Sequence, residues 1–182
     1  NSLTLKTANT FSGGSTLAGG LLKAGHNTAL GSGEVAFTGG SLSSDSGTAR
    51  TLLNALSISA GVTLGDNVNN GILTLSGPVD FNSGTRNLTV SSDVVMTGGS
   101  TNGRINKLGG AKLTLQGGTH DWNGTAEVRD GVLVLDGTSV TNTTYIRPDA
   151  RQLGGLARIA VTNGAVVVQT SNNLRVGYDG FL

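Results

Sequence analysis

Cysteine is absent from this chain of 182 residues, and it has only two prolines and 4% aromatic residues. Without cysteine there is no disulfide framework, no thiolate metal site and no cysteine nucleophile. Charge is also sparse, at 13% charged residues and a formal net charge of +1. The basic residues run from Lys6 to Arg175 and never form a run of three, so we expect no nucleic-acid partner.

Long hydrophobic runs are missing as well. Runs such as residues 165–168 (Ala-Val-Val-Val) fall far short of the ~20 apolar residues needed to cross a bilayer, so no membrane span is expected. The chain has no initiator Met and no signal pattern, and residues 1–5 already read as a strand. These features favour an interior piece of a longer protein.

Glycine, in contrast, is abundant, with 30 residues that often occur in pairs between short apolar segments. The triplet Leu-Thr-Leu occurs at residues 3–5, 73–75 and 113–115. Self-similar units of about 20–50 residues are typical of arrays in which each unit buries its apolar face against its neighbours. Function is therefore expected in a surface or a length, and not in one pocket.

Alternation of apolar and polar residues predicts short strands along most of the chain. The Asn-Gly and Asp-Gly pairs between them are a strong hairpin signal, so an antiparallel meander is an alternative. We favour the corners of a coil, because the strands come in groups of similar length with turns on both sides. The clearest predicted strands are residues 34–37, 55–58, 62–64, 87–90, 126–128 and 132–135.

Residues 103–117 (GRINKLGGAKLTLQG) and 122–135 (WNGTAEVRDGVLVL) resemble the autotransporter-associated β-strand repeat of bacterial surface proteins. Residues 3–17 are similar to the closing half of a truncated first copy, and residues 26–37 to its continuation. In the second copy, residues 118–122 depart from the Asn-Thr-aromatic signature. The resemblance implies a large exported protein built as a right-handed parallel β-helix, and it implies no catalytic residues.

We therefore predict an all-β fold, a right-handed parallel β-helix (β-solenoid) that forms a single segment over residues 1–182. At ~20–25 residues per coil this gives roughly seven to nine coils, and at ~4.8 Å per coil a rod on the order of 35–45 Å long. The residues expected to face inward are Leu5, Leu17, Leu22, Val35, Phe37, Leu56, Ile58, Val62, Leu64, Leu73, Leu75, Leu88, Val90, Val95, Ile105, Leu113, Leu115, Val128, Leu133, Leu135, Ile159, Val161, Val166, Val168, Leu174 and Val176.

Residues 145–152 (YIRPDARQ) are charged and contain Pro148, which cannot donate to a strand ladder, so they are predicted to form a loop that leaves the coil. The few aromatic residues allow two interpretations. They are either sugar-stacking platforms or, as we favour, caps and corner fillings of the coils. These aromatic residues are Trp122, Tyr145, Tyr178 and Phe181.

The only local acidic cluster is Asp121, Glu127 and Asp130, with His120 and Arg129 beside it. A polysaccharide-cleaving site needs carboxylates that converge on one exposed face. We favour the plainer interpretation of an exposed Glu127–Arg129 ion pair, because both residues share one face of a strand.

The histidines show no metal-ligand spacing, since His26 and His120 lie far apart in the sequence. The calcium-binding glycine–aspartate repeat is missing, and no double glycine is followed by the Lys-Ser/Thr of a phosphate loop. We therefore expect no metal, no cofactor and no catalytic residue.

Three functions remain, in the order in which the sequence favours them. The first is a structural segment of an extracellular or cell-surface protein, which continues into neighbouring repeats or self-associates through its terminal coils, residues 1–5 and 175–182. The second is an adhesin that presents a lateral loop, residues 147–156, to a glycan or a host surface. The third is a polysaccharide-cleaving enzyme, which the low density of carboxylates disfavours.

Overall fold

The computed structural model describes residues 1–149 and 156–170, and these are all strands, turns and irregular segments with no helix. The strands are β1 (Ser2–Leu5), β2 (Ser15–Leu17), β3 (Leu21–Ala24), β4 (Val35–Phe37), β5 (Ser41–Ser44), β6 (Arg50–Leu52), β7 (Leu56–Ile58), β8 (Val62–Leu64), β9 (Leu73–Leu75), β10 (Val79–Val90), β11 (Val94–Met96), β12 (Ser100–Leu108), β13 (Lys112–Gln116), β14 (Thr119–Trp122), β15 (Ala126–Val128), β16 (Gly131–Asp136), β17 (Ser139–Asn142), β18 (Ile146–Pro148), β19 (Ala157–Thr162) and β20 (Val166–Gln169).

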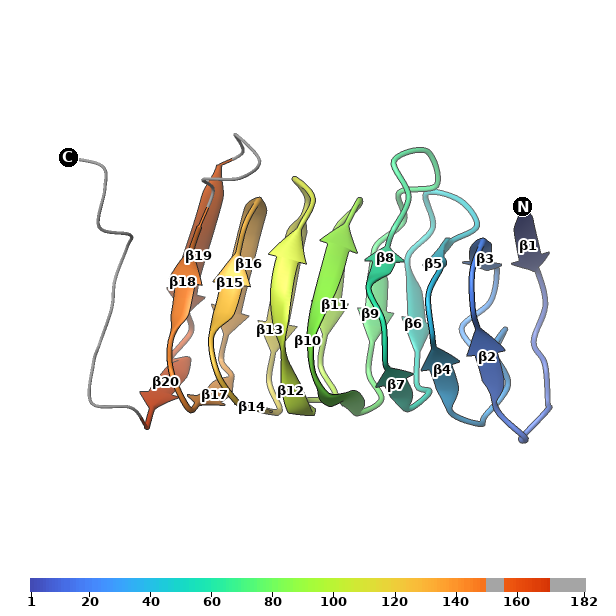
Figure 1. Cartoon of the computed structure of the whole chain (residues 1–182). Coiled ribbons are helices and arrows are strands. Elements are labelled where there is room, and N and C mark those ends of the chain that lie inside the picture. The colour runs from blue at the N-terminus through green and yellow to red at the C-terminus, as the bar shows by residue number, and fades with distance from the viewer. Residues whose placement is uncertain (150–155, 171–182) are drawn as a thin grey trace.

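The coils follow one another along a single axis, from β1 at one end to β20 at the other (Figure 1). Neighbouring strands pair in parallel along each row, which excludes the antiparallel meander. The result is a β-solenoid of about 7 turns, at the lower end of the predicted number of coils. The predicted fold class is thereby confirmed.

The chain crosses three faces in a fixed order. The first face contains β2, β4, β7, β14, β17 and β20, the second contains β1, β3, β5, β8, β15 and β18, and the third contains β6, β9, β11, β13, β16 and β19. The long strands β10 and β12 bend through a corner and contribute to the first two faces. Thus Val79 of β10 pairs with Leu56 of β7, while Leu88 of the same strand pairs with Val62 of β8.

Alternate residues point into the stack and form rows along its axis. On the third face, Leu73, Val94, Leu113 and Leu133 are in register and fully buried. Burial of such a side chain contributes about 1.5–3 kcal/mol. The predicted inward residues that are buried are Leu22, Val35, Phe37, Leu56, Ile58, Val62, Leu64, Leu73, Leu75, Leu88, Val90, Ile105, Leu113, Leu115, Val128, Leu133 and Leu135.

The inward assignment of Val95 is wrong. Val95 lies on the outer surface beside Thr74 and Thr114, while its neighbours Val94 and Met96 are buried. Three consecutive apolar residues carry no alternation, so the sequence gives no indication of which of them face the core.

The assignments in β20 are wrong by one residue. Val167 pairs with the buried Val140, so Val166 and Val168 align with the outer positions of β17, and both are exposed. As in β11, three consecutive apolar residues do not indicate which of them face the core.

In β19, Ile159 and Val161 do align with the inward residues Leu133 and Leu135. Ile159 is half-buried and Val161 is exposed, because within the described residues β19 pairs with a strand on one side only. Leu5 and Leu17, at the other end of the stack, are half-buried and pack against the core. The predicted inward residues Leu174 and Val176 lie outside the described residues.

The three Leu-Thr-Leu triplets are not equivalent positions. Residues 73–75 (β9) and 113–115 (β13) lie on the third face and stack through β11, as their repetition predicts. Residues 3–5 belong to β1, which pairs with β3 on the second face. The first triplet therefore has the same residues as the other two but lies on a different face of the coil.

The prediction that residues 145–152 leave the coil is wrong for the described part of this stretch. Residues Ile146–Pro148 form β18, which pairs with β15, and the N–H of Asp149 donates to the carbonyl of Val128 (2.7 Å). Successive N–H groups of a strand point to opposite sides, so the missing N–H of Pro148 is on the side where no described strand pairs with β18. Residues 150–152 lie outside the described ranges.

Candidate functional site

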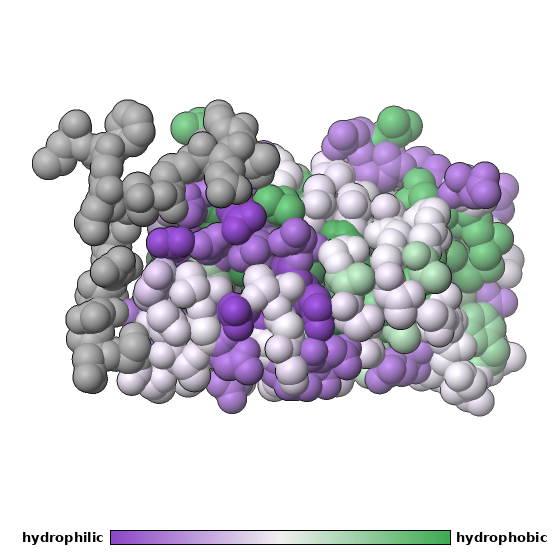
Figure 2. Space-filling model, in the orientation of Figure 1, coloured by the Kyte–Doolittle hydropathy of each residue, from purple (hydrophilic) through white to green (hydrophobic). Residues whose placement is uncertain are grey.

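The corner between the second and third faces varies in length from coil to coil. It is short at residues 91–93, 109–111 and 129–130 and longer at residues 45–49 and 65–72. The segment after β8 projects from the stack (Figure 1) and carries hydrophilic residues (Figure 2). We call segments 45–49, 65–72 and 91–93 the loop edge. Val68 is 83% exposed in it.

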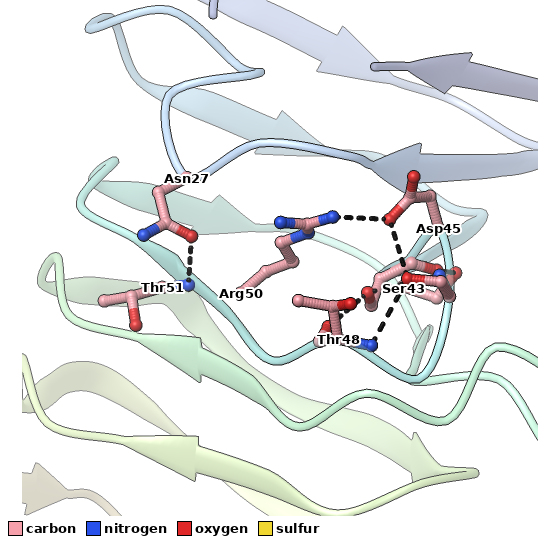
Figure 3. A network of polar contacts seen from close by, with 8 residues as sticks. Asn27, Ser43, Asp45, Thr48, Arg50 and Thr51 are labelled. Carbon is pink, nitrogen blue, oxygen red and sulfur yellow. Dashed lines mark hydrogen bonds and ion pairs between the residues drawn. The ribbon is translucent and has the colours of Figure 1, made fainter. Parts of the chain in front are cut away.

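Segment 45–49 is fixed by a polar network (Figure 3). Arg50 Nη2 donates to Asp45 Oδ1 (2.9 Å), and this bond holds the pKa of the Asp45 carboxyl below its usual value. Ser44 Oγ donates to the carbonyl of Thr48 (2.7 Å), and the N–H of Thr48 donates to Ser46 Oγ (3.2 Å). The segment is therefore held on both sides of its turn.

Segment 65–72 is held by hydrogen bonds within the segment and by a hydrogen bond to segment 45–49. Asp66 Oδ1 accepts the N–H of Val68 (3.0 Å) and Oδ2 accepts Asn69 Nδ2 (2.8 Å), and the first of these bonds lowers the pKa of the Asp66 carboxyl most. The N–H of Gly71 donates to the carbonyl of Ser46 (3.0 Å). A Cβ at position 71 would lie 2.1 Å from the carbonyl oxygen of Thr48, so only glycine permits this approach.

Between segments 65–72 and 91–93 lies a solvent-open polar pocket of about 350 Å³. One wall carries the carboxylate of Asp93, which lies 3.2 Å from Lys112 Nζ and also accepts the N–H of Lys112 (3.1 Å). The charge of Asp93 is thus compensated. The residues that line the polar pocket are Asn67, Asn70, Ile72, Ser91, Ser92 and Asp93.

The predicted Glu127–Arg129 ion pair is present, but it also includes Arg147, and Glu127 is more buried than expected. Glu127 Oε2 lies 2.8 Å from Arg129 Nη2, while Oε1 accepts two bonds from Arg147 of the next coil. The Glu127 side chain is only 12% exposed. Burial opposes ionisation, but the bonds from Arg147 and Arg129 outweigh it and lower the pKa of the Glu127 carboxyl. Such a group is poorly suited to donate a proton near neutral pH.

The acidic cluster expected around Glu127 does not converge on one face. Asp121 is exposed, while its neighbour His120 is fully buried. Asp130 Oδ1 accepts the N–H of Gly131 (2.8 Å), which fixes this carboxylate in its own turn. Asp121 lies on β14 of the first face, Glu127 on β15 of the second face and Asp130 in the corner that follows, so residues close in sequence are on different faces of the coil.

Replacing Glu127 with Gln is expected to lower the free energy of unfolding by about 1–3 kcal/mol, because Arg129 would lose its carboxylate partner and Arg147 would keep only that of Asp149 (3.4 Å) in a partly buried site. Chemical denaturation measures this loss. The control is Asp121→Asn, an exposed carboxylate that makes no hydrogen bond in the described part of the chain, for which about 0.5 kcal/mol or less is expected. Equal stability of the two variants would contradict the role assigned to Glu127.

Inside the stack, the aliphatic row of the first face is interrupted by two polar residues. Ser100 and His120 are in register, and Ser100 Oγ is 2.8 Å from His120 Nδ1. Ser100 Oγ also accepts Trp122 Nε1 (2.8 Å). His120 Nε2 and Asn142 Nδ2 are buried and have no hydrogen-bond partner among residues 1–149 and 156–170. Sequence reasoning missed this cluster, although residues 120 and 122 share one face of an alternating strand.

The aromatic residues divide between the interior and a charged surface. Trp122 is fully buried, which excludes it as a sugar-stacking platform. Tyr145 is half-buried, and the guanidinium of Arg147 lies 5.3 Å from the centre of its ring. Tyr178 and Phe181 lie outside the described residues.

A buried lysine is a further residue that the sequence did not indicate. Lys107 is fully buried, and its ammonium donates to the carbonyls of Leu108 (3.3 Å), Gly109 and Asp130 (2.9 Å). Burial lowers the pKa of Lys107 to about 8. The ammonium joins two successive corners of the stack, so its role is to hold the coils together.

Within the described residues, no three His, Asp or Glu side chains gather in a way that would hold a metal ion. The same residues include no helix long and apolar enough to span a membrane.

The chain is similar to the adhesin BmaC autotransporter of Brucella suis biovar 1 (strain 1330), with 28% identity over 167 residues. The match covers 91% of this chain and 4% of the length of that relative. No family model matches the sequence, and no solved structure gives a significant match. The chain thus resembles a small part of a very long autotransporter adhesin.

Proposed function

We propose that this chain is a structural segment of an exported bacterial surface protein, in which the β-solenoid serves as a rod and continues into neighbouring β-structure. The observation that carries the proposal is the stack of parallel coils, whose first and last strands pair on one side only within the described residues. The similarity to a small part of an autotransporter adhesin supports it, since a solenoid grows by adding coils. The low charge and the small number of carboxylates favour this function over polysaccharide cleavage.

The edge formed by β1 and β2 is suited to receive another coil. Within the described residues each of these strands pairs on one side only. Leu3 and Phe11 are exposed there, and they line an apolar cavity of about 500 Å³ together with Leu17, Leu22 and other residues of the first coils. An open parallel edge over an apolar surface is the arrangement that another β-coil would cover.

The isolated chain is expected to associate end to end as its concentration rises, and Thr4→Pro is expected to suppress the association. The N–H of Leu21 donates to the carbonyl of Asn1 and that of Gly25 to the carbonyl of Leu5. The alternate residue Thr4 therefore directs its N–H away from β3, to the open edge. Proline at this position removes the donor from the edge and leaves the pairing of β1 with β3 intact.

Sedimentation velocity over a concentration series measures the association. Thr4→Ser, which keeps the N–H, is the matched control and should associate like the wild type. A wild-type chain that stays monomeric at every concentration, or a Thr4→Pro variant that associates equally well, would contradict the proposed continuation through this edge.

A second function, adhesion through the loop edge, is favoured by the name of the relative and by the projecting segment 65–72. The loop that the sequence suggested for this role, residues 147–156, is a coil strand in its first part, so the loop edge is the better candidate. Beads coated with the chain should adhere to cultured host cells, and bare beads should not. Equal retention of coated and bare beads would contradict this function.

A further inference from the structure

The polar pocket of the loop edge offers hydrogen-bonding groups that the protein itself leaves unused. The side chains of Asn67 and Asn70 are exposed and that of Ser91 is half-buried, and none of the three makes a hydrogen bond in the described part of the chain. Ser92 Oγ accepts the N–H of Asp66 (3.3 Å), which leaves its own proton free to donate. Each of these groups can both donate and accept.

The charge of the polar pocket argues against an ionic ligand. Among the described residues, Asp93 is the only charged one that lines it, and Lys112 already compensates this carboxylate at 3.2 Å. A phosphate or a sulfate would meet the oxygens of Asp93, and a metal ion would find a single carboxylate that is already paired. Ile72, which is 44% exposed, adds an apolar surface beside the polar groups.

We propose that the polar pocket binds a neutral saccharide. Paired amides that both donate and accept match neighbouring sugar hydroxyls, which do the same. Ile72 would contact the C–H surface of the sugar ring. The volume of about 350 Å³ lies within the range of about 300–1,000 Å³ that is usual for small-molecule sites, and it suits the end of a short oligosaccharide.

The walls of the polar pocket are held in place without a ligand. Gly71 donates to the carbonyl of Ser46 (3.0 Å), and the carbonyl of Ile72 accepts the N–H of Arg50 (2.9 Å). The N–H of Asp66 donates to Ser92 Oγ (3.3 Å), which ties segment 65–72 to segment 91–93. A preformed site loses little conformational freedom on binding, so weak polar contacts are sufficient to hold a ligand.

The test is an array of neutral, sialylated and sulfated saccharides, probed with the whole labelled chain. At least one neutral saccharide should bind, and its binding should shift the backbone NMR signals of residues 67–70 and 91–93. The double substitution Asn67→Ala and Asn70→Ala should weaken this binding by about tenfold or more, as expected for two lost hydrogen bonds. Asn123→Ala, an exposed asparagine on another corner, is the matched control and should bind normally.

Three results would overturn the assignment: no neutral saccharide binds the wild type, only charged saccharides bind, or the double variant binds as tightly as the wild type. Thermal unfolding of the double variant should match that of the wild type, which separates loss of the site from loss of the fold. The proposed saccharide site rests on the adhesive function of the loop edge, and different results would contradict the site and the function. If beads coated with the double variant adhere to cells as well as beads coated with the wild type, the adhesive function is retained and the saccharide site is contradicted.

Discussion

Replacing Leu115 with Asp is expected to lower the free energy of unfolding by several kcal/mol, about 3–5, and to open the stack around β13. Leu115 is fully buried in a row of the third face, between Met96 of the coil before and Leu135 of the coil after. A carboxylate at this position would have no counter-charge in an aliphatic row. Chemical denaturation measures the loss, and Leu135→Asp should behave in the same way.

The control is Lys112→Ala on the same strand. Lys112 lies on the outer surface, and its ion pair with Asp93 is about half exposed on both sides, at 48% and 41%. Such exposed pairs contribute about 1 kcal/mol or less. If Leu115→Asp melted within a degree or two of the wild type, the inward assignment of β13 would be wrong.

The stability of the chain is expected to fall as the pH is lowered from about 6.5 to about 4, because of His120. Burial lowers the pKa of His120 from 6.5 to about 4, and no carboxylate of the described part of the chain contacts the ring. Between these values the unfolded chain binds a proton at His120 and the folded chain does not, so acid favours unfolding. The full contribution is present above pH 6.5, and the loss by pH 4 is about 3 kcal/mol.

Denaturation at a series of pH values, compared with that of His120→Val, isolates this contribution. Valine continues the aliphatic row that Val140 forms in the next coil. Carboxylates whose pKa is lowered, such as Glu127 and Asp66, also contribute less to the stability of the fold in acid, but this loss is the same in both proteins. The free energy of unfolding of the wild type, minus that of His120→Val, should therefore fall by about 3 kcal/mol between pH 6.5 and pH 4. A constant difference from pH 7 to pH 4 would mean that His120 is solvated.

Where apolar and polar residues alternate, the fold could be predicted from the sequence. Residues 62–64 (Val-Thr-Leu) and 73–75 (Leu-Thr-Leu) became strands with the expected residues inside, because a polar residue between two apolar ones fixes the direction of each. The runs at residues 94–96 and 166–168 lack that polar residue. Their register is set by pairing with the neighbouring coil, and both Val95 and Val168 were misplaced as a result.

The candidate site was harder to predict, because it is assembled from different coils. Arg147 reaches Glu127, and Ser92 reaches Asp66, only once the coils are stacked. The polar pocket likewise joins residues 67–72 with residues 91–93. Local sequence indicated the turns themselves, since asparagine and glycine tolerate positive φ, but it did not indicate which corners would be long enough to form a surface.

We propose that this chain is one stretch of a continuous β-solenoid in a longer surface protein, and imaging of the protein that contains it by electron cryo-microscopy tests this proposal most directly. We expect an uninterrupted rod in which further coils, spaced by about 4.8 Å, stack on β1 and β2 and cover Leu3 and Phe11. A structure in which a capping element of a different fold seals that edge would contradict it.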